Sequence, residues 1–190
     1  MPSILGKGSR AGRTGAGVVI AVLAEDQWPA SEDLARWRRL TPSASWVHIG
    51  VRRADLGRVG GLVEEMSEER GVRPGQLVLF GAGEIGRAAL ELVAQGSLEC
   101  AGILAIDVPC TPLPFHHLET EAVIRLVVHQ ESEEEPGLIV QLKHADVDER
   151  IIRLNQAGST TPQATGSAAE AFLLELVATV GHRPRLRASK

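Results

Sequence analysis

The chain has 190 residues, of which 44% are hydrophobic and 23% charged, as in ordinary globular proteins. This balance excludes disordered, collagen-like and disulfide-scaffold chains. The two cysteines, which lack CxxC spacing, indicate a reducing compartment, so we expect a cytoplasmic protein. The net charge of −4 and the 3% aromatic content, with no tyrosine, argue against nucleic-acid binding.

The charge distribution divides the chain into three parts. Residues 1–16 form a basic, glycine-rich tail, residues 17–180 a single acidic domain, and residues 181–190 a second basic tail. The apolar run at 15–24 follows basic residues, as in a signal peptide, but it is equally typical of a buried strand, and we favour the strand. No apolar run approaches the ~20 residues of a membrane span.

Six apolar segments predict the strands of a parallel sheet. Their apolar residues are continuous instead of alternating, as expected for strands that are buried on both faces. The segments are 18–23, 46–51, 76–80, 102–106, 124–129 and, more weakly, 150–154.

Helical patterns separate these strands. Ser31 is a suitable N-cap for a helix ending near Leu40, and apolar residues keep helical spacing over 56–66. Further helices are predicted at 87–95, at 137–145 and after a capping box formed by Ser167 and Glu170. Alternating strands and helices predict a three-layer α/β domain, a mostly parallel sheet with helices on both faces. Ligand sites in such sheets lie at the carboxyl ends of the strands, which selects the loops 24–31, 81–86, 107–120, 130–136 and 155–166.

The sequence Gly81-Ala82-Gly83-Glu84-Ile85-Gly86 lies between a predicted strand and a predicted helix. The GxGxxG spacing is typical of a dinucleotide-binding turn, in which glycines let the backbone approach a pyrophosphate. Asp107 ends the next predicted strand, where a ribose-binding acid is expected. One alternative is therefore a nucleotide- or NAD(P)-binding protein that uses Gly81, Gly83, Gly86 and Asp107.

A longer stretch around this turn favours another interpretation. Gly71-Val72-Arg73-Pro74 precedes the strand, and Ala101-Gly102-Ile103-Leu104 leads into a proline-rich loop over 109–114. In this order the segments resemble the small carboxylesterase/phospholipase family of α/β-hydrolases. The resemblance implies an α/β-hydrolase-like fold and places the turn at the G-x-S-x-G nucleophile elbow.

The same resemblance implies that the catalytic triad has degenerated. The nucleophile position is Gly83, the acid position is Glu133, and the histidine position is Ser159. The His-Gly of the family's oxyanion loop is replaced by Ala24-Glu25. Hydrolysis by the serine mechanism needs a nucleophile, a base and oxyanion donors together, so it is not expected here.

The other residues that could bind a metal or take part in catalysis are predicted to have no such role. Cys110, His116, His117, Glu119 and Glu121 are residue types that bind zinc, but their spacing matches no standard site, and we predict no metal and no cofactor. His129 is predicted to be a hydrogen-bonded structural residue. The hydroxyl-rich stretch from Ser159 to Ser167, which includes Thr165, is predicted to be a turn with an N-cap.

The function predicted from the sequence is that of a non-catalytic pseudo-esterase, which binds a partner protein, a second copy of itself or a small apolar ligand. The alternatives are the dinucleotide-binding protein and a hydrolase with a non-serine mechanism. For self-association we expect exposed apolar surface at the loop 108–115 and on the last helix, at Phe172, Leu176 and Val180.

Overall fold

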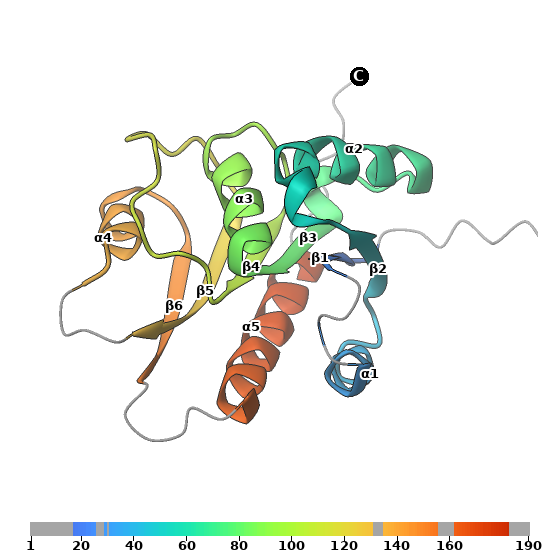
Figure 1. The fold of residues 1–190 in the computed structure, drawn as a ribbon. Helices are drawn as coiled ribbons and strands as arrows, with labels where there is room; N and C mark the ends of the chain where they lie inside the picture. Colours follow the sequence, from blue (N-terminus) through green and yellow to red (C-terminus); the bar gives the residue numbers. More distant parts are fainter. Residues whose placement is uncertain (1–16, 26–28, 30, 131–134, 156–161, 183–190) are drawn as a thin grey trace, which may run out of the picture.

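The computed structural model describes residues 17–25, 29, 31–130, 135–155 and 162–182, which form a six-stranded sheet covered by helices (Figure 1). The strands are β1 (Val19–Ala24), β2 (Ser45–Gly50), β3 (Leu77–Ala82), β4 (Gly102–Ile106), β5 (Val123–Gln130) and β6 (Glu149–Asn155). Their order in the sheet is β2-β1-β3-β4-β5-β6, and every neighbouring pair is parallel. All six predicted strands and the predicted fold class are confirmed.

Strand β1 lies between β2 and β3, with Ala21 aligned to Val47 on one side and to Leu79 on the other. Five of its six residues are buried. The apolar run near the amino end is therefore a buried strand with a neighbour on each side, and the favoured interpretation as a buried strand is confirmed.

The helices form one layer on each face of the sheet (Figure 1). One face carries α2 (Val59–Arg70), α3 (Gly83–Ala94) and α4 (Gly137–His144), which pack on one set of alternating strand residues such as Leu79 and Ile103. The opposite face carries α1 (Ser31–Leu40) and α5 (Pro162–His182), which pack on the other set, including Phe80 and Leu104. Two short 3-10 helices, η1 (Arg53–Arg58) and η2 (Pro74–Gln76), complete the connections.

Two helices begin earlier than predicted. Helix α3 starts at Gly83, four residues before the predicted 87, because the turn after β3 passes directly into the helix. Helix α5 starts at Pro162 instead of after Ser167, so Thr165 and Ser167 are helical and the predicted N-cap there is wrong. Proline suits the first turn of a helix because its missing N–H would have no intrahelical acceptor.

The apolar surface predicted for self-association on the last helix is wrong, because Phe172, Leu176 and Val180 are buried between α5 and the sheet. In the loop 108–115, Val108 and Leu113 are buried on the opposite face, whereas the prolines at 112 and 114 are exposed. The three helix residues are not open, because α5 packs on strands β4 and β5. They are therefore not available as an apolar surface for self-association.

Helix α5 is the one described helix whose length and composition would allow it to cross a membrane. A core helix passes the same test, and α5 packs Ala169, Leu173 and Leu176 into the core against the sheet.

Candidate functional site

The turn between β3 and α3 is sharp and is centred on Gly83. Ala82 is extended, with φ −127° and ψ 160°, and Gly83, the first residue of α3, has φ +53°. This left-handed conformation is strained for residues with a side chain. A strand that turns through such a residue into a helix has the geometry of a nucleophile elbow, and here the residue at its tip carries no side chain.

Two further glycines let the turn close tightly. A Cβ added to Gly86 would lie 2.7 Å from the Gly81 carbonyl oxygen, and one added to Gly81 would lie 2.9 Å from the Gly86 Cα. By contrast, a Cβ added to Gly83 would meet nothing within 4 Å. Packing therefore requires glycine at positions 81 and 86. At position 83 there is space for a side chain, and only the left-handed backbone conformation favours glycine.

A cavity of about 440 Å³ lies against this turn. Leu23, Ala24 and Glu25 line it from the end of β1, and Ala82, Gly83, Glu84 and Ile85 line it from the elbow. Arg53 and Leu56 of η1 complete the wall. We call this space the elbow pocket.

The topology of the sheet accounts for the position of the elbow pocket. From β1 the chain moves outward to β2 and then returns to place β3 on the other side of β1. Adjacent crossovers that leave in opposite directions open a crevice at the carboxyl ends of the two central strands, which is where ligands bind in open α/β sheets. Two of the five loops selected from the sequence contribute there, the first through residues 24 and 25 and the second through residues 82–85.

The elbow pocket is mainly apolar with a few charged groups at its wall. Leu56 and Ile85, which are both half-buried, supply the larger accessible apolar side chains. Glu84 lies in the first turn of α3, where a carboxylate is favoured by the helix dipole, and the exposed Arg53 supplies a cation. An apolar cavity with a few polar groups is the usual form of a small-molecule site.

The other two predicted triad positions, Glu133 and Ser159, lie outside the described residues. Next to Glu133, Glu135 pairs with Lys143 of α4 and with Arg153 of β6. Hydrogen bonds from these two cations hold the pKa of Glu135 below its usual value. Glu135 is therefore occupied in joining a helix to a strand.

Asp107, the residue proposed for ribose binding in the dinucleotide alternative, lies directly after β4. Its Oδ1 is 2.5 Å from Nδ1 of His129 in β5. The carboxylate thus already has a partner within the fold, as does His129, which was predicted to be hydrogen-bonded. Gly81, Gly83 and Gly86 occur together in the elbow turn, and their conformations are explained without a pyrophosphate.

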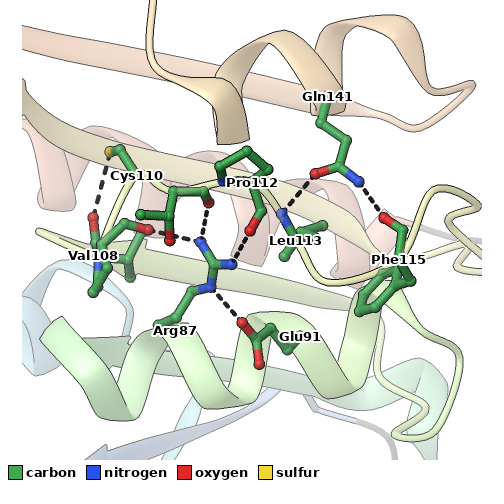
Figure 2. Close-up of polar contacts among 10 residues, drawn as sticks. Arg87, Glu91, Val108, Cys110, Pro112, Leu113, Phe115 and Gln141 are labelled. Carbon is green, nitrogen blue, oxygen red and sulfur yellow. Dashed lines mark hydrogen bonds and ion pairs between the residues drawn. The ribbon is translucent and has the colours of Figure 1, made fainter.

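The connection between β4 and β5, residues 107–122, is held in place by Arg87 of α3 (Figure 2). The Arg87 guanidinium donates to the carbonyl oxygens of Pro109, Thr111 and Pro112 at 2.6–2.9 Å and pairs with Glu91 at 2.7 Å. Gln141 of α4 adds a second tie by accepting from the backbone N–H of Leu113 and donating to the carbonyl of Phe115. We call residues 107–122 the β4–β5 loop.

The candidate metal ligands do not converge. Across the described ranges, no group of three or more His, Cys, Asp or Glu side chains is arranged to hold a metal ion. His116 and His117 are exposed on the β4–β5 loop. Cys110 is half-buried there and contacts the Val108 carbonyl. Burial raises the pKa of the Cys110 thiol, against the opposing effect of Arg87, so the thiolate is disfavoured.

Sequence reasoning missed two groups at this edge of the sheet. Arg53 and Leu56 follow β2, but the helical spacing of the apolar residues there was interpreted only as a helix, and the segment was not considered as a loop at a strand end. Thr165 lies 3.3 Å from Nε2 of His129, although it was predicted to be in a turn. Residues 53–56 follow a strand but were not among the five selected loops, whereas the loop 155–166 was selected and only the role of Thr165 in it was missed.

No protein-family model and no curated protein sequence matches the chain. Solved structures do match. YahD has a TM-score of 0.62 and 14% identity over 84% of this chain and 94% of that one. Arabidopsis thaliana SOBER1 has a TM-score of 0.61 and 15% identity, covering 85% and 100% of the two chains. The Bacillus cereus carboxylesterase has a TM-score of 0.57 and 11% identity, covering 84% and 89%. The chain therefore has the fold of α/β-hydrolase esterases.

Proposed function

We propose that this α/β-hydrolase-fold protein binds a small ligand with an apolar body in the elbow pocket and performs no elbow-centred hydrolysis. The observation that carries the proposal is Gly83, which has φ +53° at the tip of the elbow and lines the pocket. The elbow thus keeps its backbone geometry without a nucleophilic side chain. Serine-type hydrolysis requires that side chain.

The wall of the elbow pocket suggests a short-chain carboxylic acid or its ester. Leu56 and Ile85 provide an apolar surface for a hydrocarbon chain. Arg53 and the free N–H groups at the start of α3 favour a carboxylate or carbonyl oxygen. The similar structure of YahD was solved with malic acid, a carboxylic acid, which supports this ligand class.

The proposal can be tested by calorimetric titration of the full chain with acetate, butyrate and hexanoate. A chain buried against the apolar wall gains about 0.8 kcal/mol per methylene, so affinity should rise about fourfold with each one. Equal affinities across the series, or no binding of any member, would contradict an apolar pocket.

A matched pair of variants locates the site. Gly83→Asn places a side chain at the elbow pocket, and Gly71→Asn introduces the same residue at another left-handed glycine, φ +63°, at the end of α2. Asparagine tolerates this conformation better than most residues, so both variants should fold. We expect Gly83→Asn alone to weaken hexanoate binding. Ester hydrolysis that Gly83→Asn abolishes and Gly71→Asn preserves would instead show chemistry at the elbow.

A further inference from the structure

Three side chains from three elements converge near the carboxyl ends of β4 and β5. Asp107 follows β4, His129 is near the end of β5, and Thr165 is in the first turns of α5. The Asp107 Oδ1 to His129 Nδ1 distance is 2.5 Å, and the Thr165 Oγ1 to His129 Nε2 distance is 3.3 Å. Hydroxyl, imidazole and carboxylate therefore form one chain of hydrogen bonds, which we call the Thr165 relay.

With Asp107 ionised and His129 neutral, the available donors and acceptors set the direction of both hydrogen bonds. An ionised Asp107 carboxylate can only accept, so Nδ1 of His129 carries the proton. Nε2 of the neutral ring is then an acceptor, and it takes the hydrogen bond of the Thr165 hydroxyl. A hydroxyl bonded to a base that a third group orients is the arrangement that activates oxygen nucleophiles.

The Thr165 relay is accessible, and Asp107 has an unusual backbone conformation. The side chains of His129 and Asp107 are 22% and 44% exposed, and Thr165 is half-buried. Asp107 has φ +50° and is the one non-glycine residue with positive φ in the described part of the chain. Strained residues of this kind concentrate at functional sites.

We propose that the Thr165 relay is a nucleophilic site that accepts acyl groups from activated esters. The Thr165 oxygen attacks the carbonyl carbon while its proton passes to Nε2 of His129. The tetrahedral intermediate then expels the alcohol, which takes that proton, and leaves an acyl ester on Thr165. Water, deprotonated by Nε2, cleaves this ester and restores the hydroxyl. Asp107 acts as a positioning residue, because it holds the imidazole and stabilises its protonated form.

This site is independent of the elbow. One of its three residues follows β4 and the others lie in β5 and α5, whereas the elbow pocket is lined by residues in or directly after β1 and by residues of η1, β3 and α3. The inference goes beyond the proposed function. The two can fail separately, since carboxylate binding is measured without turnover and acyl transfer is measured without carboxylate.

The test uses p-nitrophenyl acetate with the full chain, acid quenching and peptide mapping by mass spectrometry. We expect p-nitrophenol release above the buffer rate and an acetyl group on the peptide that contains Thr165. Thr165→Val should abolish both signals and Thr165→Ser should retain them. His129→Gln should slow release by about 10²–10⁴-fold, the usual contribution of a general base. Asp107→Asn should slow it as well, since an amide no longer fixes the ring.

Matched controls are Ser167→Ala in the same helix and His144→Gln on α4, both exposed and outside the relay, which should leave the rate unchanged. Melting temperatures of all variants separate loss of fold from loss of the hydroxyl. Release at the buffer rate with no acetylated Thr165 would overturn the proposal. A wild-type adduct that maps to another residue would overturn it too, even if Thr165→Val does not fold.

Discussion

Gly86 determines how closely α3 can follow β3. The space for its missing Cβ is already filled by the carbonyl group of Gly81, whose oxygen would lie 2.7 Å away and whose carbon 2.8 Å away. These are backbone atoms, which cannot turn aside as the end of a flexible side chain can. The tight elbow therefore depends on this residue as much as on Gly83.

Gly86→Ala should lower the free energy of unfolding by about 1–3 kcal/mol, the usual cost of overpacking. The matched control is Gly61→Ala, at an exposed position in α2 where an added Cβ meets nothing within 4 Å. That change should raise stability by roughly 0.5–1 kcal/mol, because alanine favours the helix. Urea unfolding measures both variants. Equal effects of the two substitutions would show that the Gly81–Gly86 approach does not constrain the fold.

Individual residues also show why part of the site could not be predicted. The packing glycines and the elbow tip were identified because their spacing is local, within six residues. Asp107, His129 and Thr165 are separated by 22 and 36 positions, and their meeting depends on strand register and on where α5 begins. No local pattern carries that information.

At the scale of elements, Arg87 joins α3 to the β4–β5 loop. Its planar guanidinium reaches three backbone carbonyls and Glu91, and the side chain is only 8% exposed. A loop whose carbonyls are bound in this way does not need regular secondary structure to be ordered.

Arg87→Met should lower the free energy of unfolding by roughly 2–4 kcal/mol, since the charge-assisted hydrogen bonds of a buried guanidinium to three loop carbonyls are lost. Arg87→Lys should recover only part of this, because a single ammonium group cannot match the planar fork. Urea unfolding of the three proteins tests the order. A lysine variant as stable as the wild type would show that charge alone, without the fork geometry, holds the loop.

The strands were predicted more reliably than the helix starts, and the reason is physical. A strand buried on both faces must be continuously apolar, as in β4, whose five residues are all buried. The first turn of α3, Gly83 to Gly86, is poor in helix-forming residues and is set by the elbow. For α5, Ser167 and Glu170 have capping-box spacing, yet the helix begins earlier in the chain, at Pro162.

At the scale of the whole molecule, the order of strands places the crevice between β1 and β3, and the elbow pocket occupies it. The alternation of strands and helices was sufficient to predict the layers. The strand order was not predictable from that alternation alone, because the direction of each crossover along the sheet is not encoded in local periodicity.

The hydrogen bond between Asp107 and His129 bears on the dinucleotide alternative. Asp107 is bonded to His129, so its carboxylate would have to exchange that partner for a ribose. NAD(H) and NADP(H) should therefore leave the melting temperature unchanged, whereas a ligand at 100 times its dissociation constant would add about 2.7 kcal/mol. A dose-dependent rise of several degrees, lost in Asp107→Asn, would favour the dinucleotide alternative.

The most direct measurement of the central claim is an NMR titration of the full chain with hexanoate, following the backbone amide resonances. Binding in the elbow pocket predicts saturable shifts at residues that line it, above all at Gly83, Glu84 and Ile85 at the start of α3 and at Leu23 and Ala24 at the end of β1. The opposite end of β3, near Pro74 and Leu77, should stay unchanged. Saturable shifts confined to that opposite end, or no saturable shifts at all, would contradict the claim that the elbow pocket is the ligand site.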